Sequence, residues 1–327
     1  MRAIVCNDFA PIERLQLQVL PSPALMHGQV RIAVHAAGVN FPDALMVQGL
    51  YQARPELPFI PGNEVSGVVS EVAPDVASLK VGDRVIGLTP QGGYADEAVV
   101  GAERVLRMPD AMSHEEGATF PMVYGTSLYA LAQRGGLRAG ETLLVLGAAG
   151  GVGLAAVEIG RAMGAHVIAA ASSAEKLALA RAHGAHETID YTAERLRDGV
   201  KRLTDGRGAD LIYDPVGGDA FDEAMRSVAW LGRVLVIGFA SGRIPNLPVN
   251  LTLLKNCDVR GVFYGAWRNR EPEQGRANFE RLLGWYREGL LKPHISGRFP
   301  LEQAVDAMRT LTERKVTGKV VLVTGRS

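Results

Sequence analysis

The glycine-rich segment from Leu146 to Gly153, which reads LGAAGGVG, constrains the fold more than any other part of the chain. The apolar run from Thr142 to Leu146 predicts a strand before it, and the small-residue run from Val152 to Met163 predicts a helix after it. A glycine turn between a strand and a helix suits a dinucleotide pyrophosphate, because unpaired N–H groups at the helix N-terminus favour an anion.

The individual positions of this loop support a binding role. Gly150 would let the backbone approach the pyrophosphate, and Gly153 would let the helix pack closely on the sheet. Ala148 replaces the first glycine of the usual G-x-G-x-x-G pattern, and the alternative is a tight turn that binds no ligand. We expect a dinucleotide site, with these contact residues: Ala149, Gly150, Gly151 and Val152.

Strand and helix patterns alternate after this loop. Further strands are expected at 166–171, 210–213, 233–237 and 259–262, with helical stretches between most of them. This alternation predicts right-handed crossovers and a doubly wound parallel sheet of the Rossmann type, covered by helices on both faces.

The first third of the chain has a different pattern of apolar and turn-forming residues. Val30, Ile32 and Val34 alternate with less apolar residues, and turn signals such as Pro61-Gly62 recur at short intervals, which predicts a compact, barrel-like antiparallel unit. Helices expected at 278–288 and 301–312, and a last strand at 319–324, should pack back on this unit. We therefore expect one discontinuous catalytic domain, residues 1–124 and 265–327, around an inserted nucleotide-binding domain, residues 125–264.

Composition excludes several classes of function. Lys and Arg together number 35, as do Asp and Glu, so no net basic field exists to hold nucleic acid or an anionic membrane. The two cysteines, Cys6 and Cys257, cannot form a disulfide framework or a four-thiolate metal site. No signal peptide or membrane span is evident, so we expect a cytoplasmic protein with no membrane partner.

The end of the second expected strand bears on the choice of cofactor. NAD-binding domains place a carboxylate there for the ribose 2′-OH, whereas this chain has Ala171, followed by Ser172 and Lys176, with Tyr191 after the third strand. Hydroxyl groups and an ammonium would form hydrogen bonds with a 2′-phosphate. The alternative is that Ser172 caps the next helix and Lys176 is a solvated surface charge. We expect NADPH.

Nearly the whole chain resembles the medium-chain dehydrogenase/reductases, and within them the quinone oxidoreductase (zeta-crystallin-like) branch. The resemblance implies a GroES-like catalytic domain with a Rossmann domain inserted in it. It is carried by short segments that are weak singly and specific in this order: Gly38 to Asp43, Gly49 to Tyr51, Pro61 to Glu64, Gly82 to Val85, Gly92 to Ala95 and Gly147 to Leu154.

The resemblance also bears on metal binding. The zinc-dependent branch carries a catalytic cysteine where this chain has Asn40 and a ligand histidine where it has Asn63, and its four-cysteine lobe is missing here. Two asparagines and Glu64 do not make a tetrahedral zinc site. We expect no metal.

Without a Lewis acid, hydride from NADPH can still add to an electron-poor acceptor if the protein orients it and supplies a polar partner for its oxygen. The resemblance implies two candidate catalytic residues. Asn40 would contact the substrate carbonyl or the nicotinamide ribose, and Tyr51 would be either a proton donor or an aromatic wall of the pocket. Asp43 is expected to cap a helix, and the alternative is a catalytic role. Four further cofactor contacts are implied: Thr126, Gly238, Phe239 and Arg314.

These expectations lead to three functions. The first is reduction of a quinone or a similar small electrophilic carbonyl compound by NADPH. The second is reduction of an activated alkene: an enone, an enoyl thioester or a haloacrylate. The third is a non-catalytic NADPH-binding structural or sensor protein.

The apolar run from Val259 to Tyr264, at an expected sheet edge, further predicts a homodimer joined through edge strands.

Overall fold

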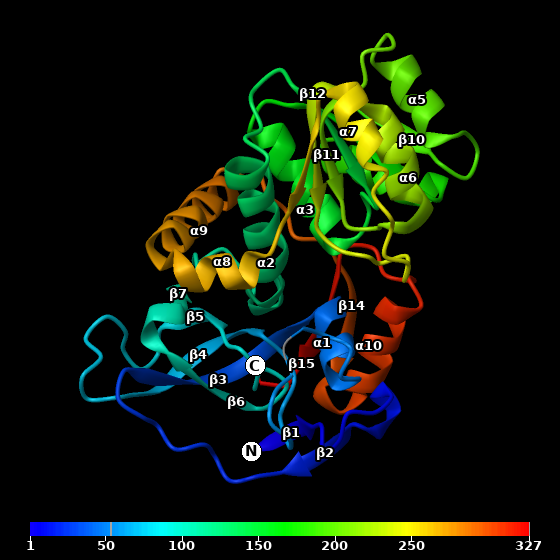
Figure 1. Ribbon diagram of the computed structural model, residues 1–327. Coiled ribbons are helices and arrows are strands. Elements are labelled where there is room, and N and C mark those ends of the chain that lie inside the picture. The colour runs from blue at the N-terminus through cyan, green and yellow to red at the C-terminus, as the bar shows by residue number, and fades with distance from the viewer. Residues whose placement is uncertain (53, 327) are drawn as a thin grey trace. The chain divides into compact units, whose positions relative to one another are not determined.

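The computed structural model describes residues 1–52 and 54–326. The chain divides into two compact units (Figure 1). Unit 1 comprises Met1–Met122 and Pro293–Ser327, and unit 2 comprises Val123–Lys292. Unit 2 is therefore inserted in unit 1, as the sequence predicts.

Unit 1 is built on a seven-stranded sheet within the described residues, with the order β14-β15-β3-β4-β5-β7 and with β6 paired to β3. All its pairs are antiparallel except β14 with β15. A separate antiparallel pair joins β1 and β2. The strands are β1 (Arg2–Val5), β2 (Gln16–Val19), β3 (Gln29–Val39), β4 (Glu64–Val72), β5 (Arg84–Leu88), β6 (Glu97–Gly101), β7 (Val105–Arg107), β14 (Ile295–Pro300) and β15 (Lys319–Val323).

The long strand β3 confirms the predicted alternation. Val30, Ile32 and Val34 are fully buried, while the residues between them are only partly buried. They form one core with side chains of β4, β15 and the two α-helices that lie wholly in this unit, α1 (Phe41–Val47) and α10 (Ala304–Thr312). Three short 3₁₀ turns complete the regular structure: Ile12–Arg14, Ala102–Arg104 and Leu301–Gln303.

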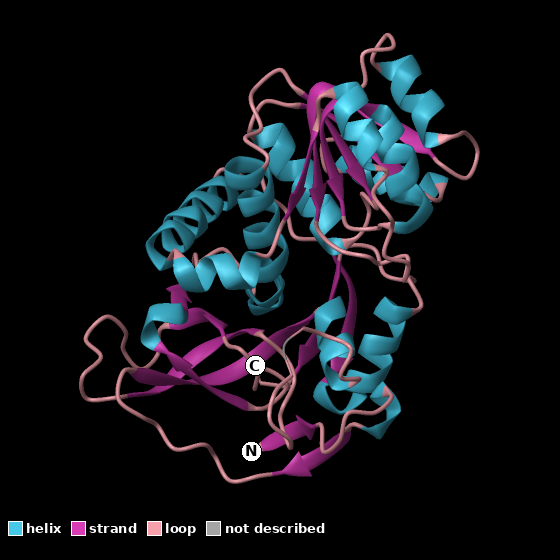
Figure 2. Cartoon of the chain, viewed as in Figure 1, coloured by secondary structure: helices cyan, strands magenta, loops and turns pink. Residues whose placement is uncertain are grey.

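Unit 2 contains a six-stranded parallel sheet with the order β10-β9-β8-β11-β12-β13. Counted from its first strand this is the 3-2-1-4-5-6 order of a dinucleotide-binding Rossmann domain. Helices flank the sheet on both sides (Figure 2). The strands are β8 (Thr142–Leu146), β9 (His166–Ala171), β10 (Glu187–Asp190), β11 (Ala209–Asp214), β12 (Val228–Val236) and β13 (Asp258–Gly261).

The helices of unit 2 follow the expected alternation with the strands. α2 (His114–Leu128) begins in unit 1, crosses the boundary without a break and continues as a π-helical turn, Tyr129–Arg134. No helix in the described residues combines the length and apolarity needed to cross a membrane. The other helices of unit 2 are α3 (Gly151–Ala162), α4 (Ala174–Ala182), α5 (Leu196–Leu203), α6 (Gly218–Ser227), α7 (Val249–Lys255), α8 (Tyr264–Arg270) and α9 (Pro272–Arg287).

The second domain boundary differs from the one expected at Gly265. Residues 265–292, which carry α8 and α9, belong to unit 2. The Trp267 ring stacks on Tyr129 with centroids 4.2 Å apart, and the Gln133 and Asn278 amides exchange hydrogen bonds of 2.9 and 3.3 Å. These long-range contacts hold both helices against the turn that follows α2. An amphipathic sequence alone does not say which apolar surface a helix will cover.

Candidate functional site

The glycine loop lies at the topological switch point of the unit 2 sheet. It follows β8, whose neighbours are β9 on one side and β11 on the other, the place where ligands bind in open α/β sheets. A Cβ added to Gly153 would collide with the Gly147 carbonyl oxygen and the Ala148 backbone. Gly153 therefore allows the close approach of helix to loop that the sequence predicts.

The N-terminus of α3 offers backbone donors. Gly150 is its N-cap, and no side chain in the described part of the protein caps the helix. The first N–H groups of a helix have no partner within the helix, and the helix dipole adds positive potential there. The next three residues, Gly151, Val152 and Gly153, form the first turn, so the loop has the donor set that a pyrophosphate requires.

Three more predicted residues lie close to this loop in unit 2. Thr126 is half-buried in α2, and its neighbour Ser127 donates a hydrogen bond of 3.0 Å to the Val152 carbonyl. Gly238 and Phe239 follow β12 in a segment that is hydrogen-bonded to the loop after β11. Val216 of that loop would contact a Cβ on Gly147. The carboxyl ends of β8, β11 and β12 thus meet around the glycine loop.

The residues expected to meet a 2′-phosphate also gather at one place. The Lys176 ammonium donates to the Ser172 hydroxyl over 3.3 Å, and the Tyr191 N–H donates to the Ala171 carbonyl over 3.3 Å. The cap of α4 is Ser173, whose hydroxyl accepts from the Lys176 N–H, so Ser172 does not have the capping role offered as its alternative.

One carboxylate lies near this cluster. Asp190 is paired in register with Ala171 at the end of β10. Its Oδ1 atom accepts hydrogen bonds from the backbone N–H and the hydroxyl of Thr192, which lower the pKa of Asp190. The Asp190 carboxylate is therefore bound within its own turn.

In unit 1 the Asn40 side chain is held by charged groups. Asn40 follows β3, is the N-cap of α1 and is 8% exposed. Its Nδ2 donates to Glu64 Oε1 at 2.8 Å and to Asn63 Oδ1 at 3.3 Å, and its Oδ1 accepts from the Lys319 ammonium at 2.6 Å.

Glu64 and Lys319 form a buried ion pair beside Asn40. Lys319 Nζ lies 2.9 Å from Glu64 Oε1 and also donates to the Val39 carbonyl at 2.9 Å. The second carboxylate oxygen of Glu64 accepts from the Met122 N–H at 2.9 Å. Each charge is thus compensated by its partner and by hydrogen bonds, the condition under which ionised groups are tolerated in a protein interior.

Asp43 occupies the third position of α1 rather than the cap itself. Its carboxylate reaches back to the Asn40 N–H at 2.8 Å and accepts from the Tyr94 hydroxyl at 2.8 Å. Burial raises the pKa of Asp43 to about 6, against the opposing effect of the Tyr94 hydrogen bond. Burial likewise raises the pKa of Tyr94 well above its ordinary value.

Tyr51 and Arg314 are the other predicted residues of unit 1. Tyr51 is half-buried against the core of this unit, and its hydroxyl makes no hydrogen bond within the described residues. Burial and the neighbouring Asp43 raise the pKa of Tyr51, so its hydroxyl keeps its proton at neutral pH. Arg314 is exposed just after α10, in a left-handed conformation with φ of 57°. The roles of both residues stay predictions.

Sequence patterns alone do not place Lys319 in the site, and they indicate Glu64 only as an inadequate zinc ligand. Lys319 begins the apolar strand KVVLV and is 6% exposed. A lysine is seldom buried unless it is paired. The sequence carries one indication of its importance, a charge at the start of a buried strand, but nothing that identifies its partner.

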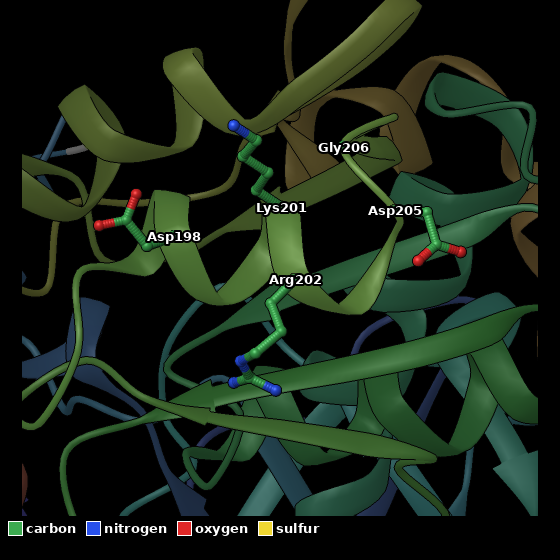
Figure 3. Close-up of a pocket in the computed structure, with 5 residues that line it drawn as sticks. All are labelled: Asp198, Lys201, Arg202, Asp205 and Gly206. Atoms are coloured by element: carbon green, nitrogen blue, oxygen red, sulfur yellow. The ribbon is translucent and has the colours of Figure 1, made fainter.

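A depression in the surface of unit 2 lies away from these residues in the sequence. It is lined by Asp198, Lys201, Arg202, Asp205 and Gly206, from α5 and the turn after it (Figure 3). Acidic and basic side chains are mixed there, and Arg202 pairs with Glu194 at 2.6 Å. None of the predicted site residues lines it.

The buried Asp43 carboxyl predicts a pH dependence of stability. Its folded-state pKa of about 6 lies above its ordinary value of 3.8, so the folded protein retains a proton that the unfolded chain has lost between these pH values. The stabilising contribution is therefore present below pH 4 and is lost as pH rises through 6. A difference of about two between the two pKa values corresponds to a change of about 3 kcal/mol in the free energy of unfolding.

Asp43→Asn keeps an oxygen acceptor and cannot ionise. We expect its free energy of unfolding, relative to wild type, to rise by up to about 3 kcal/mol between pH 4 and pH 7. Urea titrations at several pH values measure this, with Asp110→Asn, at an exposed residue, as the control. A difference that is constant with pH would contradict the assignment.

Comparison with known proteins places the chain in a family. Residues 26–110 match the family described as alcohol dehydrogenase GroES-like domain, and residues 151–281 match the family described as zinc-binding dehydrogenase. Quinone oxidoreductase-like protein 2 homolog of Nematostella vectensis is 42% identical over 326 residues, which cover 99% of this chain and 89% of that protein.

Similar solved structures point to the same family. The quinone oxidoreductase of Pseudomonas syringae pv. Tomato DC3000 has a TM-score of 0.92 and 33% identity, covering 98% of this chain and 99% of that one. Escherichia coli quinone oxidoreductase complexed with NADPH has a TM-score of 0.92 and 27% identity, covering 99% and 100%. The chain therefore belongs to the medium-chain dehydrogenase/reductase superfamily, in its quinone oxidoreductase-like branch.

Proposed function

We propose that this protein is an NADPH-dependent oxidoreductase that transfers a hydride to a quinone or a similar electron-poor conjugated carbonyl compound. The observation that carries the proposal is the glycine loop at the switch point of the unit 2 sheet, followed by a helix N-terminus that no described side chain caps. The structure of the Escherichia coli relative, which is complexed with NADPH, supports the same choice of cofactor.

The residues of unit 2 fit this cofactor. The first turn of α3 supplies N–H donors for the pyrophosphate, with Ala149 and Gly150 leading into it. Ser172 and Lys176 supply a hydroxyl and an ammonium for the 2′-phosphate, beside Tyr191. Thr126, Gly238 and Phe239 are proposed to line the remainder of the site. NADPH bound there supplies the hydride.

The residues of unit 1 are proposed to act on the acceptor. Asn40 provides a fixed polar group, and Tyr51 provides a protonated hydroxyl for the oxygen or carbon that must gain a proton. Arg314 is proposed to meet the adenosine end of the cofactor. The acceptor must itself be electron-poor, because these groups polarise a carbonyl less strongly than a metal ion does.

We propose that the reaction uses no zinc. The described residues contain no group of three or more His, Cys, Asp or Glu side chains that could hold a metal ion. The Lys319 ammonium lies within 2.9 Å of Glu64 and of the Asn40 carboxamide, where it would repel a second cation.

Two alternatives use the same cofactor site. Reduction of an activated alkene requires the same hydride and, in addition, a proton on carbon, for which Tyr51 is the candidate. A non-catalytic NADPH-binding role would leave Tyr51 as a pocket wall. Because the relatives include a quinone oxidoreductase and a quinone oxidoreductase-like protein, a quinone is favoured as the acceptor over these alternatives.

We also propose a homodimer formed through β13. This strand lies at the edge of the unit 2 sheet, and large apolar side chains near it are exposed, including Phe263 at 57% and Leu253 at 78%. An unpaired edge strand beside exposed apolar groups is suited to pairing with a second copy.

The proposed activity predicts that the protein, dialysed against a chelator, oxidises NADPH when a quinone is added. A panel of quinones, enones and acyl thioesters in one buffer, followed by absorbance of NADPH, measures this directly. Activity with enones but not quinones would favour the alkene reductase. Activity that is lost on chelation and restored by zinc would contradict the metal-free reaction. NADPH binding without turnover on any acceptor would favour the non-catalytic role.

The phosphate cluster predicts a preference for NADPH over NADH. A charge-assisted hydrogen bond contributes about 1.5–3 kcal/mol, so Lys176→Ala should weaken NADPH binding about tenfold or more. NADH binding should be nearly unchanged, because NADH lacks the 2′-phosphate. Ala171→Asp should reverse the preference by repelling the phosphate and accepting from the 2′-OH.

Calorimetry of both cofactors measures these changes, with Lys201→Ala, at an exposed lysine of α5, as the control for loss of surface charge. Equal wild-type affinity for NADPH and NADH would mean that Lys176 is only a solvated surface charge.

Tyr51→Phe tests the proton donor. Removal of a general acid typically costs about 10²–10⁴-fold, so turnover of an enone should fall by at least about a hundredfold while NADPH affinity is kept. Turnover of a quinone should be kept, since a reduced quinone can take its protons from water. The phenylalanine ring preserves the packing. A loss below about threefold with the enone would make Tyr51 a wall rather than a donor.

A further inference from the structure

Two fully buried hydroxyl groups are in contact in unit 2. Ser127 lies in α2 and Tyr213 in β11, 86 residues apart in the sequence, and neither side chain is exposed to solvent. Their oxygen atoms are 2.9 Å apart, and Ser127 Oγ also lies 3.0 Å from the Val152 carbonyl oxygen in α3. The two hydroxyls therefore connect a strand and a helix of unit 2 to the helix that follows the glycine loop.

The direction of each hydrogen bond follows from the chemistry of the groups. A carbonyl oxygen only accepts, so Ser127 donates its single hydroxyl hydrogen to Val152. Ser127 then has only lone pairs to offer Tyr213, so the Tyr213 hydroxyl is the donor in that contact. Burial raises the pKa of Tyr213, against the opposing effect of the Ser127 hydrogen bond, so its hydroxyl keeps its proton at neutral pH. The result is a hydroxyl relay: Tyr213 donates to Ser127, and Ser127 donates to Val152.

The hydroxyl relay ends at a peptide group in the first turn of α3. Gly150 is the N-cap of this helix, so the N–H groups of the residues just after it have no acceptor within the helix. The Val152 carbonyl and the Gly153 N–H belong to one planar trans peptide group and point in opposite directions. A hydrogen bond to the carbonyl polarises this group, because hydrogen bonds in a chain strengthen one another in a protein interior. The Gly153 N–H is then a stronger donor to an anion at the helix N-terminus.

We propose that Ser127 and Tyr213 are positioning residues for the cofactor: their hydroxyl relay holds the first turn of α3 in place and polarises the Gly153 N–H towards the dinucleotide pyrophosphate. Both side chains act through the Val152 carbonyl rather than by contact with the cofactor. This inference rests on the proposed function, and it concerns a part of the cofactor that NADPH and NADH share.

Two observations favour this role over ordinary packing. A serine or threonine within a helix commonly bonds to a carbonyl of its own helix, as Thr119 in α2 and Ser227 in α6 do. Ser127 instead bonds to a carbonyl of α3, in the turn that carries the proposed pyrophosphate donors. At the fully buried position of Tyr213, a phenyl ring would pack without needing a polar partner, whereas the hydroxyl must have one.

The first test compares three ligands by calorimetry. Ser127→Ala removes the hydrogen bond to α3 and should weaken NADPH and NADH binding by the same factor, about two- to tenfold, the value of one neutral hydrogen bond. Adenosine 2′-monophosphate has no pyrophosphate, so its affinity should stay unchanged. Ser227→Ala is the matched control, because it removes a buried serine hydroxyl that donates over 2.8 Å to a carbonyl of α6. It should change none of the three affinities.

The second test separates positioning from stability. Ser127→Ala leaves the buried Tyr213 hydroxyl without its acceptor, which should lower the free energy of unfolding in urea titrations. Combining it with Tyr213→Phe removes both partners, so the free energy of unfolding should recover. The NADPH affinity should not recover, because Tyr213 acts through Ser127, and the double variant should bind as weakly as Ser127→Ala. Tyr213→Phe alone should weaken binding by less than Ser127→Ala, because Ser127 can still donate to Val152.

Three results would overturn the inference. One is unchanged affinity for NADPH and NADH in Ser127→Ala. Another is an equal weakening of adenosine 2′-monophosphate, which would indicate a general distortion of unit 2. The third is recovery of NADPH affinity together with stability in the double variant, which a purely structural role would produce. Failure of the wild-type protein to bind NADPH or NADH would instead reject the proposed function.

Discussion

The buried ion pair between Lys319 and Glu64 is the interaction on which unit 1 depends. It joins β15, near the C-terminus, to β4, and through hydrogen bonds it reaches the end of β3 and the Met122 N–H in α2. Removing one partner of such a pair typically costs about 3–5 kcal/mol, because the other charge stays buried without compensation. The last strand of the chain is therefore required to complete the surroundings of Asn40.

Unit 2 depends on a different constraint, the close approach of α3 to the loop that follows β8. Only glycine fits at position 153, where any Cβ would meet the Gly147 carbonyl. The same geometry leaves the first N–H groups of α3 directed away from the helix body, as an anion site requires. One steric requirement thus serves both the packing of the domain and the proposed cofactor site.

Local features of the fold could be predicted from the sequence. The glycine loop, the strands beside it and the insertion of one unit in the other follow from patterns that span a few tens of residues. The neighbourhood of Ala171, Ser172 and Tyr191 also follows, because parallel neighbouring strands bring their carboxyl ends to one edge.

Long-range contacts could not be predicted in this way. Lys319 and Glu64 are separated by 255 residues, and neither carries a local signal of its partner. The assignment of α8 and α9 to unit 2 depends on contacts such as that between Trp267 and Tyr129. The cap of α4 is Ser173 rather than Ser172. The sequence could not distinguish the two, because adjacent serines are equivalent by pattern until the backbone angles are known.

The central proposal is that this member of the family transfers a hydride from NADPH to an electron-poor acceptor. A single-turnover measurement with NADPH carrying deuterium at C4 tests it most directly. The account predicts slower oxidation in the presence of a quinone when one of the two C4 hydrogens is deuterium and no change when the other is, because the protein presents one face of the ring. Equal rates for both labelled forms and unlabelled NADPH, or binding with no oxidation at all, would contradict it.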